Sequence, residues 1–195
     1  MDLLQQAAQA WLVLTDYEYH IVCAKKQKLH DLYLRFAPDE FFHMAGFQHL
    51  KDIVLPVRFS QARAMDKVLQ GAITESHISK SQAYTASVRP RLQAMVQLKN
   101  MLDSNFVTYS FDPGKALTYT RICASYLITG GNSDVVFLFT DRKNSGKEVF
   151  SRSVFLLDQR DYRKNQAKLT LLLAERRNLK TQEYTVLYRH ENYTL

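Results

Sequence analysis

Two histidines stand among bulky apolar residues in the segment FFHMAGFQHL, and histidine is the side chain that most readily exchanges protons near neutral pH. His43 and His49 flank Gly46. On one continuous helix their spacing turns the two rings about 120° apart, which excludes a shared metal site, but a helix that ends at Gly46 removes that restriction. We expect His43 to be a general base or acid, with a half-buried histidine bonded to a backbone carbonyl as the alternative.

Polar side chains also interrupt segments that are otherwise apolar. Arg121 and Arg152 could bind a phosphate group, although a solvent-exposed face of a sheet would explain them equally well. Strand alternation predicts that Ser151 and Ser153 lie on one face and Arg152 on the other. The candidate hydrogen-bond donors to a phosphate are Tyr119, Ser151 and Thr140.

The run from Asp158 to Lys168 surrounds Tyr162 with four cations. Such a run could bind a phosphate backbone while the tyrosine ring stacks on a base. A solvated loop or helix face is the plainer alternative. The candidates for nucleic-acid binding are Arg160, Tyr162, Arg163 and Lys164.

The composition is that of a globular protein: 195 residues, 46% hydrophobic, with a formal net charge of +7. Residues 141–195 contain 12 basic and 7 acidic side chains, so most of the positive charge lies there. A localised positive surface attracts nucleic acid or an anionic membrane. No segment is long and apolar enough to predict a membrane span, and no signal peptide is evident, so we expect a cytoplasmic protein.

Several familiar catalytic motifs are missing from the sequence, among them the phosphate-binding loop, G-x-S-x-G, H-E-x-x-H and C-x-x-C. Cys23 and Cys123 are too few for a disulfide framework or a zinc site. We therefore expect no cofactor and no metal ion. A metal enzyme would need a carboxylate beside His43 and His49, and the acidic residues near them in sequence are Asp39, Glu40 and Asp52.

Hydrophobic periodicity predicts an α+β fold in one domain, residues 1–195. Its expected parts are an N-terminal helix and β-hairpin, a helical insert at about 60–104 and a C-terminal antiparallel sheet. Residues 169–188 fit either a hairpin or one long helix. Helices are expected at 2–14, 39–45, 60–70, 75–84 and from 90 to about 102. Strands are expected at 17–24, 29–36, 106–111, 116–128, 135–140 and 149–156.

The segment Leu32–Phe36 leads into a pattern F-x-H-L-x-G, in which Met44 replaces the leucine. With the order of the later strands and the basic segment 162–166, it resembles the fourth phage-linked group of the Barnase–EndoU–colicin E5/D–RelE nucleases. The resemblance implies a ribonuclease-like fold with a four- or five-stranded antiparallel sheet. It also implies RNA cleavage without metal, in which the 2′-hydroxyl attacks its own phosphodiester. His43 is the one site residue that the pattern itself supplies.

The same resemblance implies a toxin or takeover factor that acts on RNA in the bacterial cytosol, with tRNA as a candidate substrate and an inhibitor protein as a candidate partner. A second class of function is a non-catalytic RNA- or protein-binding module of the same fold. An enzyme requires His43 and an arginine of the sheet to converge on one cleft. A binding module would instead show a flat basic surface with His43 buried.

Overall fold

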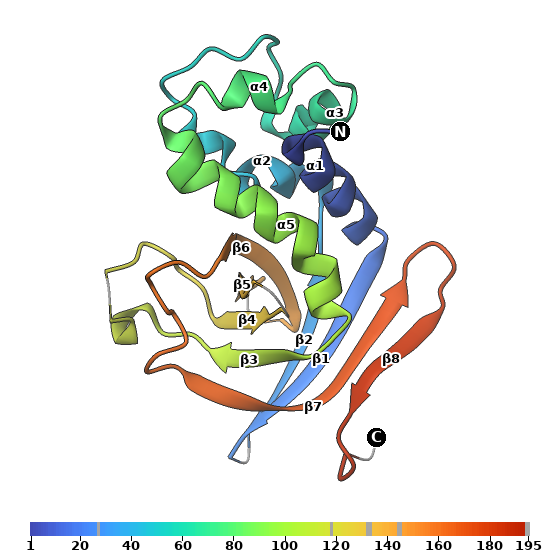
Figure 1. The fold of residues 1–195 in the computed structure, drawn as a ribbon. Coiled ribbons are helices and arrows are strands. Elements are labelled where there is room, and N and C mark those ends of the chain that lie inside the picture. Colours follow the sequence, from blue (N-terminus) through green and yellow to red (C-terminus); the bar gives the residue numbers. More distant parts are fainter. Residues whose placement is uncertain (27, 118, 132–133, 144–145, 194–195) are drawn as a thin grey trace.

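The computed structural model describes residues 1–195 except 27, 118, 132–133, 144–145 and 194–195. Its strands form a sheet of order β1-β2-β6-β5-β4-β3-β7-β8, and an additional pairing of β7 with β1 closes the first seven into a ring (Figure 1). Neighbours are antiparallel except β2 and β6, which pair in parallel. The strands are β1 (Tyr17–Lys25), β2 (Lys28–Arg35), β3 (Phe106–Ser110), β4 (Tyr126–Gly130), β5 (Val136–Arg142), β6 (Glu148–Leu156), β7 (Ala167–Asn178) and β8 (Tyr184–Arg189).

The helices gather at one end of this closed sheet (Figure 1). The first helix leads into β1, and the others lie between β2 and β3. The start of β1, the end of β2 and the start of β3 lie at the same end of the sheet, because β1 and β3 run in one direction and β2 runs in the other. The α-helices are α1 (Leu3–Leu14), α2 (Phe41–Met44), α3 (Ala64–Leu69), α4 (Glu75–Ile78) and α5 (Arg89–Leu102). Single turns of 3₁₀-helix lie at Pro38–Glu40, Phe47–His49, Gln61–Arg63 and Pro113–Lys115, and a π-turn lies at Tyr84–Val88. No helix in the described part of the chain has the length and apolar character that a membrane crossing needs.

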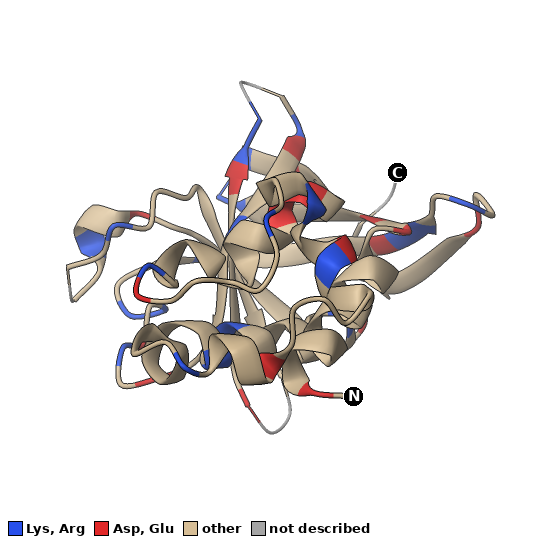
Figure 2. Ribbon diagram, turned by 90° about the horizontal axis from the view of Figure 1, so that it is seen from above, with Lys and Arg blue, Asp and Glu red and all other residues tan. Residues whose placement is uncertain are grey.

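The side chains of β5 divide the interior into two clusters. Val136 and Leu138 point into the main core, which α1 and α5 cover, and strand alternation sends Phe137 and Phe139 to the outer face. There they join a cluster that we name the outer aromatic cluster. Its members are Phe111, Leu127, Phe137, Phe139, Phe155 and Tyr162. Seen along the strands, the centre of the molecule is nearly free of charged residues, which occupy the surrounding loops and helices (Figure 2).

The prediction of helices and strands in one mixed fold is confirmed, and residues 169–188 form the hairpin of β7 and β8. The expectation of a separate C-terminal antiparallel sheet is corrected, since the N-terminal hairpin joins the later strands and closes the ring. The predicted strand 116–128 is also shorter: only Tyr126–Gly130 is a strand, and Thr118 lies outside the described residues. The segment before it crosses the outer face instead, where Ile122 and Ala124 cover the outer aromatic cluster. The alternation that predicted a strand arises because Ile122 and Ala124 face this cluster while Arg121 and Cys123 face solvent.

Candidate functional site

A cleft of about 770 Å³ lies where the start of α5, the end of β6 and the segments 119–122 and 158–162 meet. It brings together four of the residues expected from sequence: Tyr119, Arg121, Arg160 and Tyr162. Arg91 and His49, which sequence reasoning did not select, line the same cleft. The cleft therefore gathers cationic and aromatic groups from segments far apart in the chain.

Arg91 is the most enclosed cation of the cleft. Its Nη1 donates to Ser153 Oγ at 2.9 Å, and its guanidinium carbon lies 5.8 Å from the centre of the Phe155 ring. Among the described residues, no carboxylate lies within ion-pair distance of it. Burial lowers its pKa, but arginine stays charged near neutral pH because its ordinary pKa is far higher. The cleft thus contains a fixed positive charge that an anion could neutralise.

The chain reverses at Gly46, and this turn brings the two histidines close together. Helix α2 ends at Met44, Gly46 has φ +86°, and a 3₁₀ turn at Phe47–His49 follows. A β-carbon at Gly46 would lie 2.9 Å from Arg91 Cδ, so the absence of a side chain also makes room for the arginine. The 120° separation expected on one continuous helix does not apply here, because the helix is broken.

Both histidines have a lowered pKa. For His43 the first cause is burial, followed by the charge of Arg91, while contact with the Arg152 backbone acts in the opposite direction. For His49 burial again comes first, followed by the charges of Arg91 and His43. The charge of Arg91 acts on both histidines and that of His43 acts on His49, so the three side chains lie near one another. Both rings retain exposed surface, while the contact of His43 with the Arg152 backbone is the kind that the plainer alternative expected.

Two further arginines lie along the cleft in different states. The exposed Arg121 forms no ion pair with any described carboxylate. Arg160 pairs with Asp158, its Nη2 lying 2.6 Å from Oδ2. A ligand phosphate would meet Arg121 directly and would compete with Asp158 for Arg160. Tyr119 is 85% exposed, so its ring is free to stack on a flat group.

The structure places Thr140 and Ser151 in the interior, with only 0% and 6% of their surface exposed. Phe139 pairs with Ser153 and Thr140 pairs with Ser151, so β6 carries one extra residue, Arg152. This bulge corrects the expected alternation: Ser151 faces the main core with Thr140, whereas Ser153 faces outward and contacts Arg91. Neither Thr140 nor Ser151 lines the cleft.

Four other predicted residues are not among those that line the cleft: His43, Arg152, Arg163 and Lys164. Arg152 pairs with Asp141 at 3.1 Å, and Arg163 pairs with Asp161 at 2.8 Å. Tyr162 lines the cleft but is only 4% exposed within the outer aromatic cluster, so the expected base stacking on its ring is not available. Lys164 lies in the turn that precedes β7, outside the cleft lining.

Arg91 and Ser153 give little sign of their position in the sequence. Arg91 lies beside Pro90 at the start of a predicted helix, where an arginine is ordinary. Ser153 was visible as one of two serines in a strand, but the bulge that turns it toward Arg91 depends on pairing with β5. His49 was visible as the second histidine of its segment.

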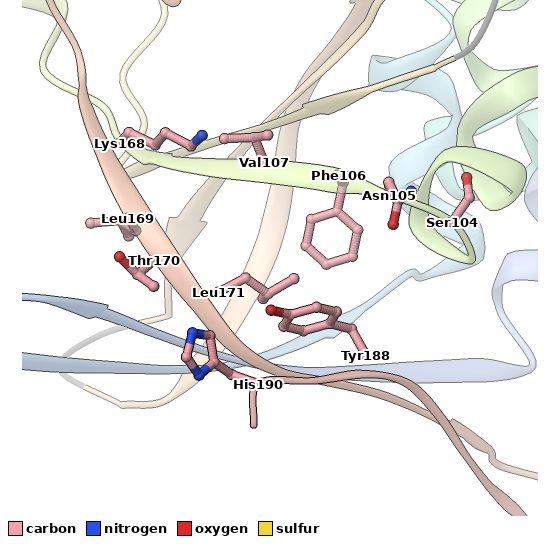
Figure 3. A pocket seen from close by; sticks show the side chains of 10 residues that line it. All are labelled: Ser104, Asn105, Phe106, Val107, Lys168, Leu169, Thr170, Leu171, Tyr188 and His190. Atoms are coloured by element: carbon pink, nitrogen blue, oxygen red, sulfur yellow. The ribbon is translucent and has the colours of Figure 1, made fainter. Parts of the chain in front are cut away.

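A second cavity, of about 400 Å³, lies where β3 and β8 approach β7 (Figure 3). Its lining includes Lys168, Tyr188 and His190, but none of the residues predicted to form a site. In the described part of the chain, no group of three or more His, Cys, Asp or Glu side chains is arranged to bind a metal ion. The cleft therefore holds Tyr119, Arg121, Arg160 and Tyr162 of the predicted residues, and the second cavity holds none of them.

The fold and the cleft define a mixed α/β protein that concentrates arginine and histidine around one concave site. Residues 3–191 match the family described as phage-Barnase-EndoU-ColicinE5/D-RelE like nuclease4, and the chain belongs to that family. This confirms the resemblance inferred around His43 and indicates a nuclease-like function with a nucleic-acid substrate. No curated protein and no solved structure matches the chain.

Proposed function

We propose that this protein is a metal-independent ribonuclease and that the cleft beside Arg91 is its active site. The observation that supports this proposal is that His49 lines one cleft with Arg91, an arginine that no described carboxylate neutralises, while His43 lies near enough to feel the charge of Arg91. Acid–base catalysis of phosphodiester cleavage needs a proton acceptor, a proton donor and a positive charge near phosphorus. The three side chains supply these groups.

In the proposed reaction, one histidine in its neutral form accepts the proton of the 2′-hydroxyl, and the 2′-oxygen attacks the adjacent phosphorus. The other histidine, protonated, donates its proton to the departing 5′-oxygen. The products are a 2′,3′-cyclic phosphate and a free 5′-hydroxyl, and the two histidines have exchanged protonation states. Arg91 stabilises the negative charge that develops on the phosphorane oxygens, and Ser153 fixes the guanidinium in place.

The rest of the cleft would bind the nucleotides next to the scissile bond. Arg121 offers a charge for a neighbouring phosphate, and the ring of Tyr119 offers a stacking surface for a base. Arg160 would hold a second phosphate in exchange for Asp158. This arrangement suits a single strand whose bases are unstacked, such as an RNA loop, and tRNA is one such substrate.

The direct test is incubation of purified protein with total bacterial RNA in EDTA, followed by gel analysis of the products. We expect discrete fragments from the wild type, and a loss of rate of about 10²- to 10⁴-fold in His43→Ala and His49→Ala. His77→Ala is the matched control, because His77 lies on α4 and bonds to Thr74. Melting temperatures within a few degrees of wild type exclude unfolding as the cause.

Intact RNA with every variant would contradict the proposal. Binding of RNA without cleavage would then favour the non-catalytic module. A role as a toxin belongs to the same proposal and predicts growth arrest that depends on His43. An inhibitor protein that blocks the cleft would relieve this arrest.

A further inference from the structure

A group of basic residues lies at the end of the closed sheet away from the helices. The β1–β2 turn contributes Lys25, Lys26 and Lys28, and β2 and β5 contribute His30 and Arg142. We name this group, Lys25, Lys26, Lys28, His30 and Arg142, the distal basic cluster. A cavity of about 580 Å³ is lined by the three lysines, His30 and Ser110. It is separate from the cleft, with which it shares no lining residue.

Strand alternation points the polar groups of this cluster into the mouth of the closed sheet. His30 shares its face with the core residues Leu32 and Leu34, and Arg142 shares its face with Leu138. Tyr126, at the start of β4, joins the two: Arg142 Nη2 donates to Tyr126 Oη at 2.6 Å, and His30 Nδ1 lies 3.0 Å from the same oxygen. Hydrogen bonds therefore join His30, Tyr126 and Arg142 at the mouth of the closed sheet.

The hydrogen bonds determine which ring nitrogen of His30 is free. Tyr126 Oη accepts from Nε and Nη2 of Arg142, so its own proton is available to His30 Nδ1. The neutral ring then carries its proton on Nε2, and no described residue bonds to that nitrogen. Burial and the charges of Lys28 and Arg142 lower the pKa of His30, which keeps the ring neutral. His30 thus presents one donor to a ligand.

The charges around this donor are all of one sign. Lys25, Lys26, Lys28 and Arg142 form no ion pair with any carboxylate of the described chain. An open site with several exposed cations and a neutral donor suits a phosphate group. The chain belongs to a nuclease family, so a nucleic-acid strand is the source of phosphates that it meets.

We propose that the distal basic cluster is a second phosphate-binding site, which holds the backbone of an RNA strand outside the cleft. That the same RNA strand also enters the cleft rests on the proposed function. Strand β6 runs between the two sites: Val149, near its start, pairs with Arg142 of the distal basic cluster, and Phe155 and Leu156 at its end line the cleft. Its 9 residues span roughly 26 Å at about 3.3 Å per residue. At about 3.4 Å per stacked nucleotide, an RNA needs about eight nucleotides to reach both sites.

The test compares a 20-nucleotide single-stranded RNA with a dinucleotide, using Lys25→Gln/Lys28→Gln protein. Binding of the 20-mer is measured in the His43→Ala background, so that no cleavage occurs. We expect a lower affinity, and a slope of log K against log salt that is about 1.4 smaller, because two phosphate contacts are lost at about 0.7 each. Dinucleotide cleavage, measured with His43 intact, should be unchanged. Lys80→Gln, an exposed lysine on the helical side, is the control.

Unchanged affinity and salt slope for the 20-mer would overturn the proposal. So would a variant that loses binding only to phosphatidylserine vesicles, because the cluster would then be a membrane contact. A His30→Ala variant that binds the 20-mer normally would remove the histidine from the site and contradict the donor role. If the wild type cleaves neither the dinucleotide nor the 20-mer, the proposed function fails, but the binding comparison still decides the second site.

Discussion

Arg91 Nη1 donates a hydrogen bond of 2.9 Å to Ser153 Oγ, which joins the first turn of α5 to the bulged part of β6. The guanidinium of an arginine is held in one orientation only where such a partner exists, because its side chain is long and flexible. The bulge at Arg152 turns Ser153 outward and thereby provides the partner. The position of the positive charge in the cleft depends on this contact.

The first prediction concerns this contact. Ser153→Ala should lower kcat by about 10- to 150-fold with little change in KM, because one hydrogen bond to a charged group contributes about 1.5–3 kcal/mol and orients Arg91 in the transition state. Ser153→Thr retains the hydroxyl and should restore most of the rate, whereas Arg91→Gln should lose about 10²- to 10³-fold. Steady-state kinetics on a dinucleotide would measure all three. An unaltered kcat in Ser153→Ala would contradict the positioning role.

The second prediction concerns pH. The pKa values of His43 and His49 are both lowered from 6.5 by burial and by Arg91, so each ring loses its proton at a lower pH than usual. A reaction that needs one neutral and one protonated ring is fastest between the two pKa values. We therefore expect a bell-shaped profile of kcat/KM with its maximum below pH 6.5. A rate that keeps rising above pH 7 would show that another group is the acid.

The third prediction concerns Gly46, with Gly71 as its control. Both have positive φ, +86° and +74°, so alanine at either position should cost about 1–2 kcal/mol of folding stability. At Gly46 the new β-carbon would lie 2.9 Å from Arg91 Cδ, whereas at Gly71 the nearest atom is 3.9 Å away. Gly46→Ala should therefore also lose activity. Equal activities in the two variants, measured below their melting temperatures, would refute the link to Arg91.

The fourth prediction concerns Tyr119, the exposed ring of the cleft. Tyr119→Ala should weaken RNA binding by about 1–3 kcal/mol, which is typical of a lost base-stacking contact. Tyr119→Phe keeps the ring and should bind as the wild type does. Tyr184→Ala removes an exposed ring on β8, outside the cleft, and serves as the control. Fluorescence anisotropy would detect the difference, and equal losses at both tyrosines would exclude a specific stacking role.

The fifth prediction concerns the stability of the segment that leads to His43. Burial raises the pKa of Glu40 from 4.5 to about 7, so its stabilising effect is complete below pH 4.5 and is lost as the pH rises through 7. Glu40→Gln cannot ionise, and its stability relative to wild type should increase by about 3 kcal/mol between pH 4.5 and pH 8. Denaturant unfolding at both values would measure this. Asp39→Asn, an exposed neighbour, should show no comparable change.

The sequence by itself determined most of the local structure. The aromatic and β-branched runs at 17–24 and 29–36 became β1 and β2, and the apolar periodicity of 2–14 became α1, because these patterns depend on near neighbours in the chain. The F-x-H pattern at Phe41 identified the family and His43. Cationic residues for a nucleic-acid partner were visible as well.

Only the tertiary structure decided which of these residues share a site. Pairing of β1 with β7 closes the sheet, and pairing of β5 with β6 creates the bulge that separates Ser151 from Ser153. The pairing of β1 with β7 joins residues as far apart in the chain as Ala24 and Thr170, and the bulge depends on a shift of register between Phe139 and Thr140; local patterns carry no information about either. For the same reason Tyr162 was expected at a surface but lies in the outer aromatic cluster. Arg91 became a site residue because α5 packs across β6, a contact that no spacing in the sequence reveals.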